Sequence, residues 1–531
     1  MHDLIIVGAG TAGCVLAERL TRSGKLRVLL VEAGGKPRSR FVGIPAAVPK
    51  LFRTDLDWAF ESEPQAAAAG RRIFTPRGRM LGGSANLNFQ IHQWCHPADF
   101  EGWVAAGATG WGWNDVAPVF LRQENWRGAD GQDARGRAGP MIISPNRNAR
   151  LLSRAFVAAA REAGLGARSD SYNGGAYIGA WLSELAQKKG RRFSAYDAYL
   201  KPATRRPNLE VAGETHITKI VLEGNHAVGV AARRGSYETT YPCGGVVVAA
   251  GAFGSPQLLM LSGIGPAASL SSLGIPVRRD APEVGANLQD HPVSPLTFRV
   301  RGTDTFKNAE SPLNLIRYLA LRRGMLASNG AEAIVFVQTQ PGAVSAPDVE
   351  LIFLPLEWRN QALEPPQIHA CTLAVAVVAP RSRGRVALRS AEPGAAPLID
   401  FKLLSDPDGL DAAALLSGAR VARRIAATPP LALEIVDELR PGASVESDVD
   451  LLRALGAELQ TVYHPAGTCR MGSDPRAVVD PKLRVQGMDR LWVADASVMP
   501  AVPRGHPNAV VAMIAERGAE WIESALVAGT T

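Results

Sequence analysis

The sequence predicts an α/β fold with a parallel sheet, and three features near its N-terminus support this prediction. Apolar runs at 4–7 and 27–31 are typical of two short buried strands. Between them, apolar residues recur with helical spacing at 14–20. Glycines at positions 8, 10 and 13 form a G-x-G-x-x-G turn between the first run and the helical segment. This order predicts a β-α-β unit.

The glycine turn has the spacing of a dinucleotide-binding turn. Gly8 allows a tight turn, Gly10 allows close approach of a pyrophosphate, and Gly13 allows the helix to pack on the strand. The helix would begin near Thr11 and Ala12, where free N–H groups and the helix dipole favour an anion. A structural βα turn could share this spacing, but the complete β-α-β pattern favours a dinucleotide site.

Glu32 closes the second strand and is followed by Ala33. A carboxylate at this place accepts hydrogen bonds from the hydroxyls of an adenosine ribose, and it would repel a 2′-phosphate. The unit is therefore expected to bind FAD or NAD rather than NADP.

Composition points to a globular protein and argues against a nucleic-acid partner. The chain has 531 residues, 46% of them hydrophobic and 20% charged, and a net charge of +8. Its densest basic groups, at 188–192 and 381–385, are short, and elsewhere the basic residues are mixed with acids. Such a pattern argues against a nucleic-acid site and allows weak attraction to anionic surfaces.

The cysteines and the apolar segments predict a cytoplasmic location. Five cysteines, an odd number without a C-x-x-C pair, favour reduced thiols. The first strand starts near residue 3, so no signal peptide is expected. No stretch of about 18 apolar residues is free of glycine and charge, so we expect no membrane span.

A second glycine turn lies at Gly82-Gly83-Ser84, where it would open an apolar helical segment. A simple helix cap would explain this turn by itself. Two anion-binding turns in one chain are better explained by a single large cofactor that both turns contact.

Several motifs together resemble those of the glucose-methanol-choline (GMC) flavin oxidoreductases, which include alcohol and choline dehydrogenases and aryl-alcohol oxidases. They are PRGRMLGGSANLN (76–88) with HPADFEGW (96–103), the segment 251–265, VGANLQDH (284–291), YHPAGTCRMG (463–472) and VADASVMPAVP (493–503).

The resemblance implies a discontinuous, Rossmann-like FAD-binding domain with an inserted α+β substrate domain. The FAD-binding domain would comprise 1–155, 194–306 and 459–531. The substrate domain, 156–193 and 307–458, would be an antiparallel sheet flanked by helices. Local patterns agree, because 246–251 is typical of a buried parallel strand and 373–378 and 386–388 are typical of short strands.

The resemblance also implies which residues contact FAD. Leu87 stands where some choline-oxidising relatives attach FAD through a histidine, so the FAD is expected to be non-covalent. Trp94, in place of a common arginine, is expected near the substrate side and would favour aromatic or apolar substrates. Beyond the first β-α-β unit, the implied contacts are Gly82, Gly83, Asn88, Ile217, Ala250, Asp495, Ala496, Asn508 and Ala509.

Two histidines are the candidate catalytic residues. His464 follows the inserted segment, and His506 lies eleven residues after Asp495, the offset of the family's second catalytic residue. Histidine suits proton transfer because its usual pKa lies near neutrality. Asn508 nearly fits the same spacing and remains the alternative, and either histidine could instead be a satisfied core residue.

The resemblance therefore implies oxidation of a primary alcohol, with aromatic or heteroaromatic alcohols as candidates, to an aldehyde. The hydroxyl proton would be abstracted while a hydride passes to flavin N5, and the electrons would go to oxygen or a quinone-type acceptor. A flavin-containing hydroxynitrile lyase and a non-catalytic flavin scaffold are the alternatives. We expect a monomer or small homo-oligomer.

A metal site is not expected. His92, Cys95 and His96 could pass for ligands, but no fourth ligand is evident and Pro97 would break a helix there.

Overall fold

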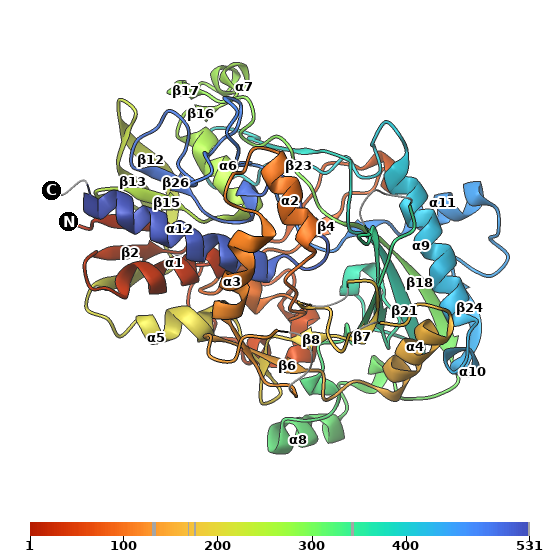
Figure 1. Ribbon diagram of the computed structural model, residues 1–531. Coiled ribbons are helices and arrows are strands. Elements are labelled where there is room, and N and C mark those ends of the chain that lie inside the picture. Colours follow the sequence, from red (N-terminus) through yellow and green to blue (C-terminus); the bar gives the residue numbers. More distant parts are fainter. Residues whose placement is uncertain (130–133, 168, 175–176, 341–344, 529–531) are drawn as a thin grey trace.

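A computed structural model describes residues 1–531 except 130–133, 168, 175–176, 341–344 and 529–531. The fold is mixed α/β, as predicted, with a parallel sheet near the two termini and an antiparallel sheet at the opposite end of the molecule (Figure 1). In the described part of the chain, no helix is both long and apolar enough to cross a membrane.

The parallel sheet has five strands, and every residue of its three central strands is buried. Such burial on both faces explains why these strands appear as continuous apolar runs. Helix α1 (Thr11–Thr21) follows the first strand and lies beside α12 (Asn508–Ala528), where Arg19 Nη2 is 2.6 Å from a carboxylate oxygen of Glu516. The order across the sheet is β11 (Leu209–Ala212), β2 (Val28–Val31), β1 (Leu4–Val7), β15 (Val246–Val248) and β26 (Leu491–Val493).

The larger sheet is antiparallel and has two different faces. Helices α4 (Leu151–Glu162) and α9 (Leu410–Ala426) pack on one face against the odd-numbered residues of β20. The alternate residues Glu350, Ile352 and Leu354 point to the other face, because side chains alternate along a strand. The strand order is β24 (Ile435–Arg440), β18 (Pro292–Val300), β21 (Ala370–Val377), β20 (Val349–Leu354), β19 (Ala333–Val337) and β7 (Gly179–Leu182), and β25 (Gln460–Thr461) also pairs with β18.

The antiparallel sheet does not follow the expected domain ranges. Strands β18 and β25 fall within 194–306 and 459–531, which were assigned to the FAD-binding domain. Both nevertheless pair in the antiparallel sheet. An apolar run indicates a strand but not which other strand it pairs with. The sequence pattern therefore could not assign β18 and β25 to one sheet or the other. The domain ranges stay a proposal.

Shorter elements connect and cover the two sheets. The predicted strands at 373–378 and 386–388 are confirmed by β21 of the larger sheet and by the shorter β22 (Arg385–Ala387). The helices are α2 (Pro97–Ala105), α3 (Trp113–Gln123), α5 (Lys201–Ala203), α6 (Gly251–Leu261), α7 (Ala267–Ser272), α8 (Pro312–Leu321), α10 (Leu431–Glu434) and α11 (Asp448–Ala457). The other strands are β3 (Phe60–Glu61), β4 (Phe74–Thr75), β5 (Glu124–Trp126), β6 (Met141–Pro145), β8 (Glu184–Leu185), β9 (Gln187–Lys188), β10 (Arg191–Arg192), β12 (His216–Glu223), β13 (His226–Arg234), β14 (Tyr237–Pro242), β16 (Ile264–Gly265), β17 (Arg279–Asp280) and β23 (Leu398–Asp400).

Candidate functional site

A cavity of about 470 Å³ lies between the two sheets. Val7 and Val31, at the carboxyl ends of β1 and β2, line one part of it, and Ile352 and Leu354 of β20 line another. Ligands of open α/β sheets bind beyond the carboxyl ends of the strands, so this cavity is the candidate site.

The two glycine turns lie against each other in this cavity. Gly82 N donates a hydrogen bond to Ala9 O at 2.7 Å, and a Cβ on Gly83 would lie 2.7 Å from Gly10 Cα. A Cβ on Gly10 would meet nothing within 4 Å, so its free side opens into the cavity it lines. The two turns are therefore in direct contact at one side of the cavity. The predicted helix after the second turn is wrong, since Gly83–Asn86 forms only a 3₁₀ turn.

Glu32 lies at the end of β2 with its carboxylate buried at the cavity wall. Its oxygens accept hydrogen bonds from Ala9 N and Gly34 N, both at 2.9 Å. Burial raises the pKa of Glu32 to about 7, although the two N–H groups oppose that shift. Each carboxylate oxygen has further lone pairs, so the carboxylate suits a ligand that donates hydroxyl hydrogen bonds.

Asp495 anchors the start of α6 rather than presenting a free carboxylate. It accepts hydrogen bonds from Gly251 N and Ser497 N at 2.8 Å, and from the Ser255 hydroxyl. Asp495 and Ala496 both line the cavity. The side chain of Asp495 thus shapes this wall of the cavity.

Most residues expected to contact the cofactor line the cavity. Gly13, Gly82 and Ala509 do not; a Cβ on Gly13 would lie 1.8 Å from Gly8 O, which agrees with its expected packing role. Those that line the cavity are Gly8, Gly10, Thr11, Ala12, Glu32, Ala33, Gly83, Asn88, Ile217, Ala250, Asp495, Ala496 and Asn508.

The two candidate histidines lie side by side at the cavity. The ring centroids of His464 and His506 are 4.9 Å apart, and the ring planes are nearly perpendicular at 83°. Nδ1 of His464 is 3.1 Å from Nδ1 of His291, and Nε2 of His506 is 2.9 Å from Glu350 Oε1. His464 N donates to Asp290 Oδ1 at 2.8 Å. Each ring is thus held by a neighbour on one nitrogen.

Asn508, the alternative to His506, points elsewhere. Its Oδ1 accepts a hydrogen bond from Thr11 Oγ1 at 2.7 Å, which joins the start of α12 to the first glycine turn. The geometry therefore brings His506, rather than Asn508, to His464.

The surroundings of His464 favour its neutral form. Burial, and then the neighbouring His506, His291 and Arg77, lower the pKa of His464 well below its usual value. Burial and His506 likewise lower the pKa of His291 to about 3. Burial raises the pKa of Asp290 to about 7 despite its backbone hydrogen bonds. A neutral His464 leaves Nε2 as a possible proton acceptor, and this atom has no hydrogen-bond partner among the described residues.

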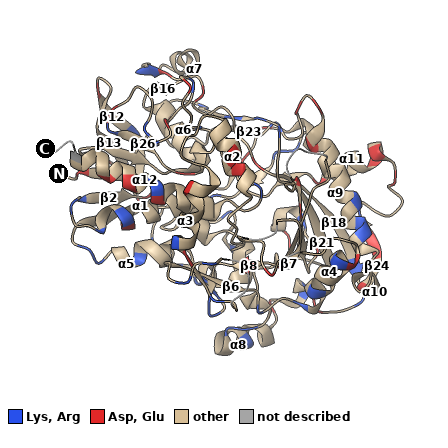
Figure 2. Ribbon diagram, viewed as in Figure 1, with Lys and Arg blue, Asp and Glu red and all other residues tan. Residues whose placement is uncertain are grey.

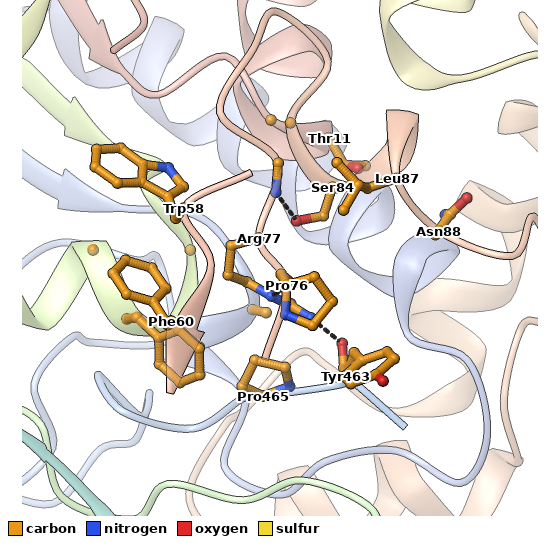
Figure 3. A pocket seen from close by; sticks show the side chains of 18 of the residues that line it. Thr11, Trp58, Phe60, Pro76, Arg77, Ser84, Leu87, Asn88, Tyr463 and Pro465 are labelled. Atoms are coloured by element: carbon orange, nitrogen blue, oxygen red, sulfur yellow. Dashed lines mark hydrogen bonds between the residues drawn. The ribbon is translucent and has the colours of Figure 1, made fainter. Parts of the chain in front are cut away.

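Arg77 links the second glycine turn to the segment that carries His464. Its Nη2 donates to Tyr463 O at 2.6 Å, and Figure 3 shows this contact across the cavity wall. The adjacent Gly78 N donates to Ser84 Oγ at 3.1 Å (Figure 3). One partly buried arginine thus connects the segment of the second glycine turn with the segment that carries His464.

The sequence interpretation did not assign roles to His291, Glu350 or Arg77. His291 ends a motif that was recognised, and Arg77 lies within another. Glu350 had a weaker signal, since it is the charged residue inside the apolar run 349–354. A lone carboxylate in a buried strand is costly unless it has a partner, and here that partner is His506.

Aromatic and apolar side chains form the rest of the cavity wall. Phe89 and Trp358, with ring centroids 6.1 Å apart, cluster with Ile352 and Leu354. Figure 3 shows Trp58 and Phe60 on another wall, where their rings stack 5.8 Å apart. The polar groups are few, so the cavity suits a ligand with a substantial apolar part.

Trp94 and His96 have structural roles outside the cavity lining. Trp94 does not line the cavity but stacks on Phe120 in the core, with ring centroids 5.7 Å apart, so its expected position was wrong. His96 caps α2, because its Nδ1 accepts a hydrogen bond from Ala98 N at 3.0 Å.

Two models of the GMC oxidoreductase family match the chain, over residues 2–293 and 380–515. An uncharacterized GMC-type oxidoreductase of Mycobacterium tuberculosis is 44% identical, over 98% of this chain and 99% of that protein. An alcohol dehydrogenase [acceptor] of Pseudomonas putida is 38% identical, over 98% of this chain and 96% of its own.

A solved structure shows the same architecture. Pyridoxine 4-oxidase from Mesorbium loti superposes with a TM-score of 0.89 at 32% identity, over 98% of both chains.

Proposed function

The chain belongs to the GMC oxidoreductase family, and from that premise we propose that it oxidises a primary alcohol to an aldehyde. The observation that carries the proposal is the histidine pair. The ring centroids of His464 and His506 are 4.9 Å apart, at a cavity that is also lined by residues of both glycine turns.

Members of the family depend on FAD, and the residues of the cavity fit that cofactor. The open side of Gly10 would receive the pyrophosphate, and the Glu32 carboxylate would accept the adenosine ribose hydroxyls. Leu87 lines the cavity and has no nucleophilic atom, which supports non-covalent binding. When bound, FAD supplies the acceptor for the hydride that leaves the carbinol carbon.

His464 is assigned the role of base. It is neutral near pH 7, its Nδ1 is engaged by His291, and its Nε2 is left to take the hydroxyl proton of the alcohol. Removal of that proton is needed before or while the carbinol hydrogen departs, because only then can the carbonyl form.

His506 is assigned the role of second catalytic residue, which hydrogen-bonds the alcohol oxygen while His464 acts as the base. Nε2 of His506 lies 2.9 Å from Glu350 Oε1, and this contact would hold the ring beside His464, where it can hydrogen-bond the alcohol oxygen. Two histidines that contact the same hydroxyl group would fix its position.

The substrate is proposed to be an apolar primary alcohol, with aromatic and heteroaromatic alcohols as candidates. Phe89, Trp358, Ile352 and Leu354 supply an apolar wall for its body. The names of the Pseudomonas putida and Mesorbium loti proteins, an alcohol dehydrogenase [acceptor] and a pyridoxine 4-oxidase, support an alcohol substrate, and pyridoxine is a heteroaromatic alcohol.

Anaerobic bleaching of the flavin tests this function. Purified holoprotein would be mixed without oxygen with pyridoxine, benzyl alcohol and 1-octanol, and the visible flavin absorbance followed. Bleaching by at least one alcohol, with the matching aldehyde as product, is expected. Readmission of air then tells whether oxygen restores the colour or an added quinone is required. No bleaching by any primary alcohol in a wider panel would overturn the proposal.

A further inference from the structure

Helix α8 (Pro312–Leu321) exposes an unusual number of large apolar side chains. Between 44% and 75% of the surface of five of them is exposed, whereas Tyr318 is the buried residue of this helix. Isolated exposed leucines are common on protein surfaces, but a contiguous apolar patch marks an interaction site. The exposed residues are Leu313, Leu315, Ile316, Leu319 and Leu321.

The apolar face of α8 is turned to solvent. At 3.6 residues per turn, Leu313, Ile316 and Leu319 recur at intervals of three and share one face. Tyr318 lies away from that face and donates a hydrogen bond from its hydroxyl to Gly43 O at 3.1 Å. An ordinary surface helix has the opposite orientation, with its apolar stripe toward the core.

Basic side chains lie on α8 and at its C-terminal end. No aspartate or glutamate occurs between residues 311 and 331, and Glu310 is paired with Lys50 at 2.8 Å. The β9–β10 hairpin lies against the end of α8, because a Cβ on Gly190 would lie 2.1 Å from Arg322 O. Figure 2 shows basic colour and no acidic colour on α8. Arg192 of the hairpin is buried. The basic residues that are at least partly exposed on α8, directly after it and in the hairpin are Lys188, Lys189, Arg191, Arg317, Arg322 and Arg323.

We propose that α8 and the β9–β10 hairpin form a docking surface for an anionic lipid membrane. An apolar helix face that enters the boundary between headgroups and acyl chains, with arginine and lysine beside it, is the pattern of a helix that lies in a membrane surface. The basic residues would contact lipid phosphates while Leu313, Ile316 and Leu319 insert. A second copy of the chain fits this surface less well, since a twofold interface would bring two basic rims together.

Vesicle co-sedimentation of the holoprotein tests the proposal. The probes are phosphatidylcholine vesicles with and without about half phosphatidylglycerol. Wild-type protein is expected to sediment with the anionic vesicles, and less so as salt rises. The double variants Ile316→Asp/Leu319→Asp and Arg317→Glu/Arg323→Glu are each expected to lower the partition coefficient at least about tenfold.

A matched control variant is Leu151→Asp/Leu433→Asp, which places the same charges at exposed leucines outside α8. It should bind vesicles like the wild type, and all variants should keep their flavin absorbance and melting temperature. Equal binding to neutral vesicles, no vesicle binding, or equal loss in the control would overturn the proposal. If Ile316→Asp/Leu319→Asp instead turned a dimer into a monomer on size-exclusion chromatography without any vesicle binding by the wild type, the face would belong to a second copy.

Discussion

His464 is surrounded by groups that oppose its protonation, and this has a consequence for the pH profile. Because burial and the nearby His506, His291 and Arg77 lower its pKa, the neutral form persists below the usual histidine pKa of about 6.5. Flavin reduction by alcohol should therefore stay level as pH falls from 8 to about 6.5, and decline only below it. Anaerobic stopped-flow rates across this range check the prediction. If the reduction rate instead fell with an apparent pKa at or above about 6.5, the titrating base would be a group other than His464.

Glu32 is expected to control cofactor affinity rather than chemistry. A carboxylate that accepts hydroxyl hydrogen bonds contributes about 1.5–3 kcal/mol. Glu32→Ala should therefore weaken FAD binding roughly ten- to a hundredfold, as measured by flavin retention during dialysis. Glu214 is exposed, and its carboxylate lies next to Gly35, three residues after Glu32. Glu214→Ala is therefore the matched control and should retain FAD normally. Equal retention in both variants would rule out the role of Glu32.

Asn508 and His506 are separable by mutation because they contact different parts of the cavity. Asn508→Ala removes the acceptor of Thr11 Oγ1, so it should weaken FAD binding by a few-fold while the reduction rate of bound FAD is nearly kept. His506→Ala should slow reduction by about a hundredfold, and His506→Asn less, since an amide can still donate to the alcohol oxygen. Single-turnover rates of FAD-saturated variants decide this, and a rate loss in Asn508→Ala equal to that in His506→Ala would reverse the assignment.

At the scale of elements, the β1-α1-β2 unit was well predicted because its determinants are local. The apolar runs, the helical spacing and the three glycines all lie within one stretch of chain, and the structure has both strands and the helix. The segment after Gly82 was predicted less well. Gly83 packs against Gly10 of the first glycine turn, and the segment Gly83–Asn86 forms a 3₁₀ turn there instead of an α-helix. Such a contact between distant segments is not visible in the local sequence pattern.

The packing of α1 against its strand gives a prediction about Gly13. A Cβ there would lie 1.8 Å from Gly8 O, so Gly13→Ala must displace backbone and should cost about 1–3 kcal/mol of stability. Gly102, in α2, has nothing within 4 Å of an added Cβ. Gly102→Ala should therefore be neutral or stabilise by up to about 1 kcal/mol. Denaturant midpoints of the two variants test this, and a Gly13→Ala midpoint equal to that of the wild type would contradict the packing argument.

At the scale of the whole molecule, the site joins segments that are far apart in the sequence. His464 and His506 were found from motifs. Their neighbours come from elsewhere in the chain: His291 directly precedes β18, Glu350 lies in β20, and the antiparallel sheet brings both near the histidine pair. Strand pairing of this kind is non-local, so patterns along the chain do not reveal it. The same reason explains why β18 was expected outside that sheet.

The central claim is that His464 removes the hydroxyl proton of a primary alcohol at this cavity. General-base catalysis contributes about 10²–10⁴ in rate, so loss of the base should slow the reduction of bound FAD itself. The most direct measurement is anaerobic stopped-flow bleaching of His464→Ala, saturated with FAD, by an alcohol that reduces the wild type. The expected result is a rate constant at least about a hundredfold lower with flavin content unchanged. A rate constant close to that of the wild type would contradict the claim.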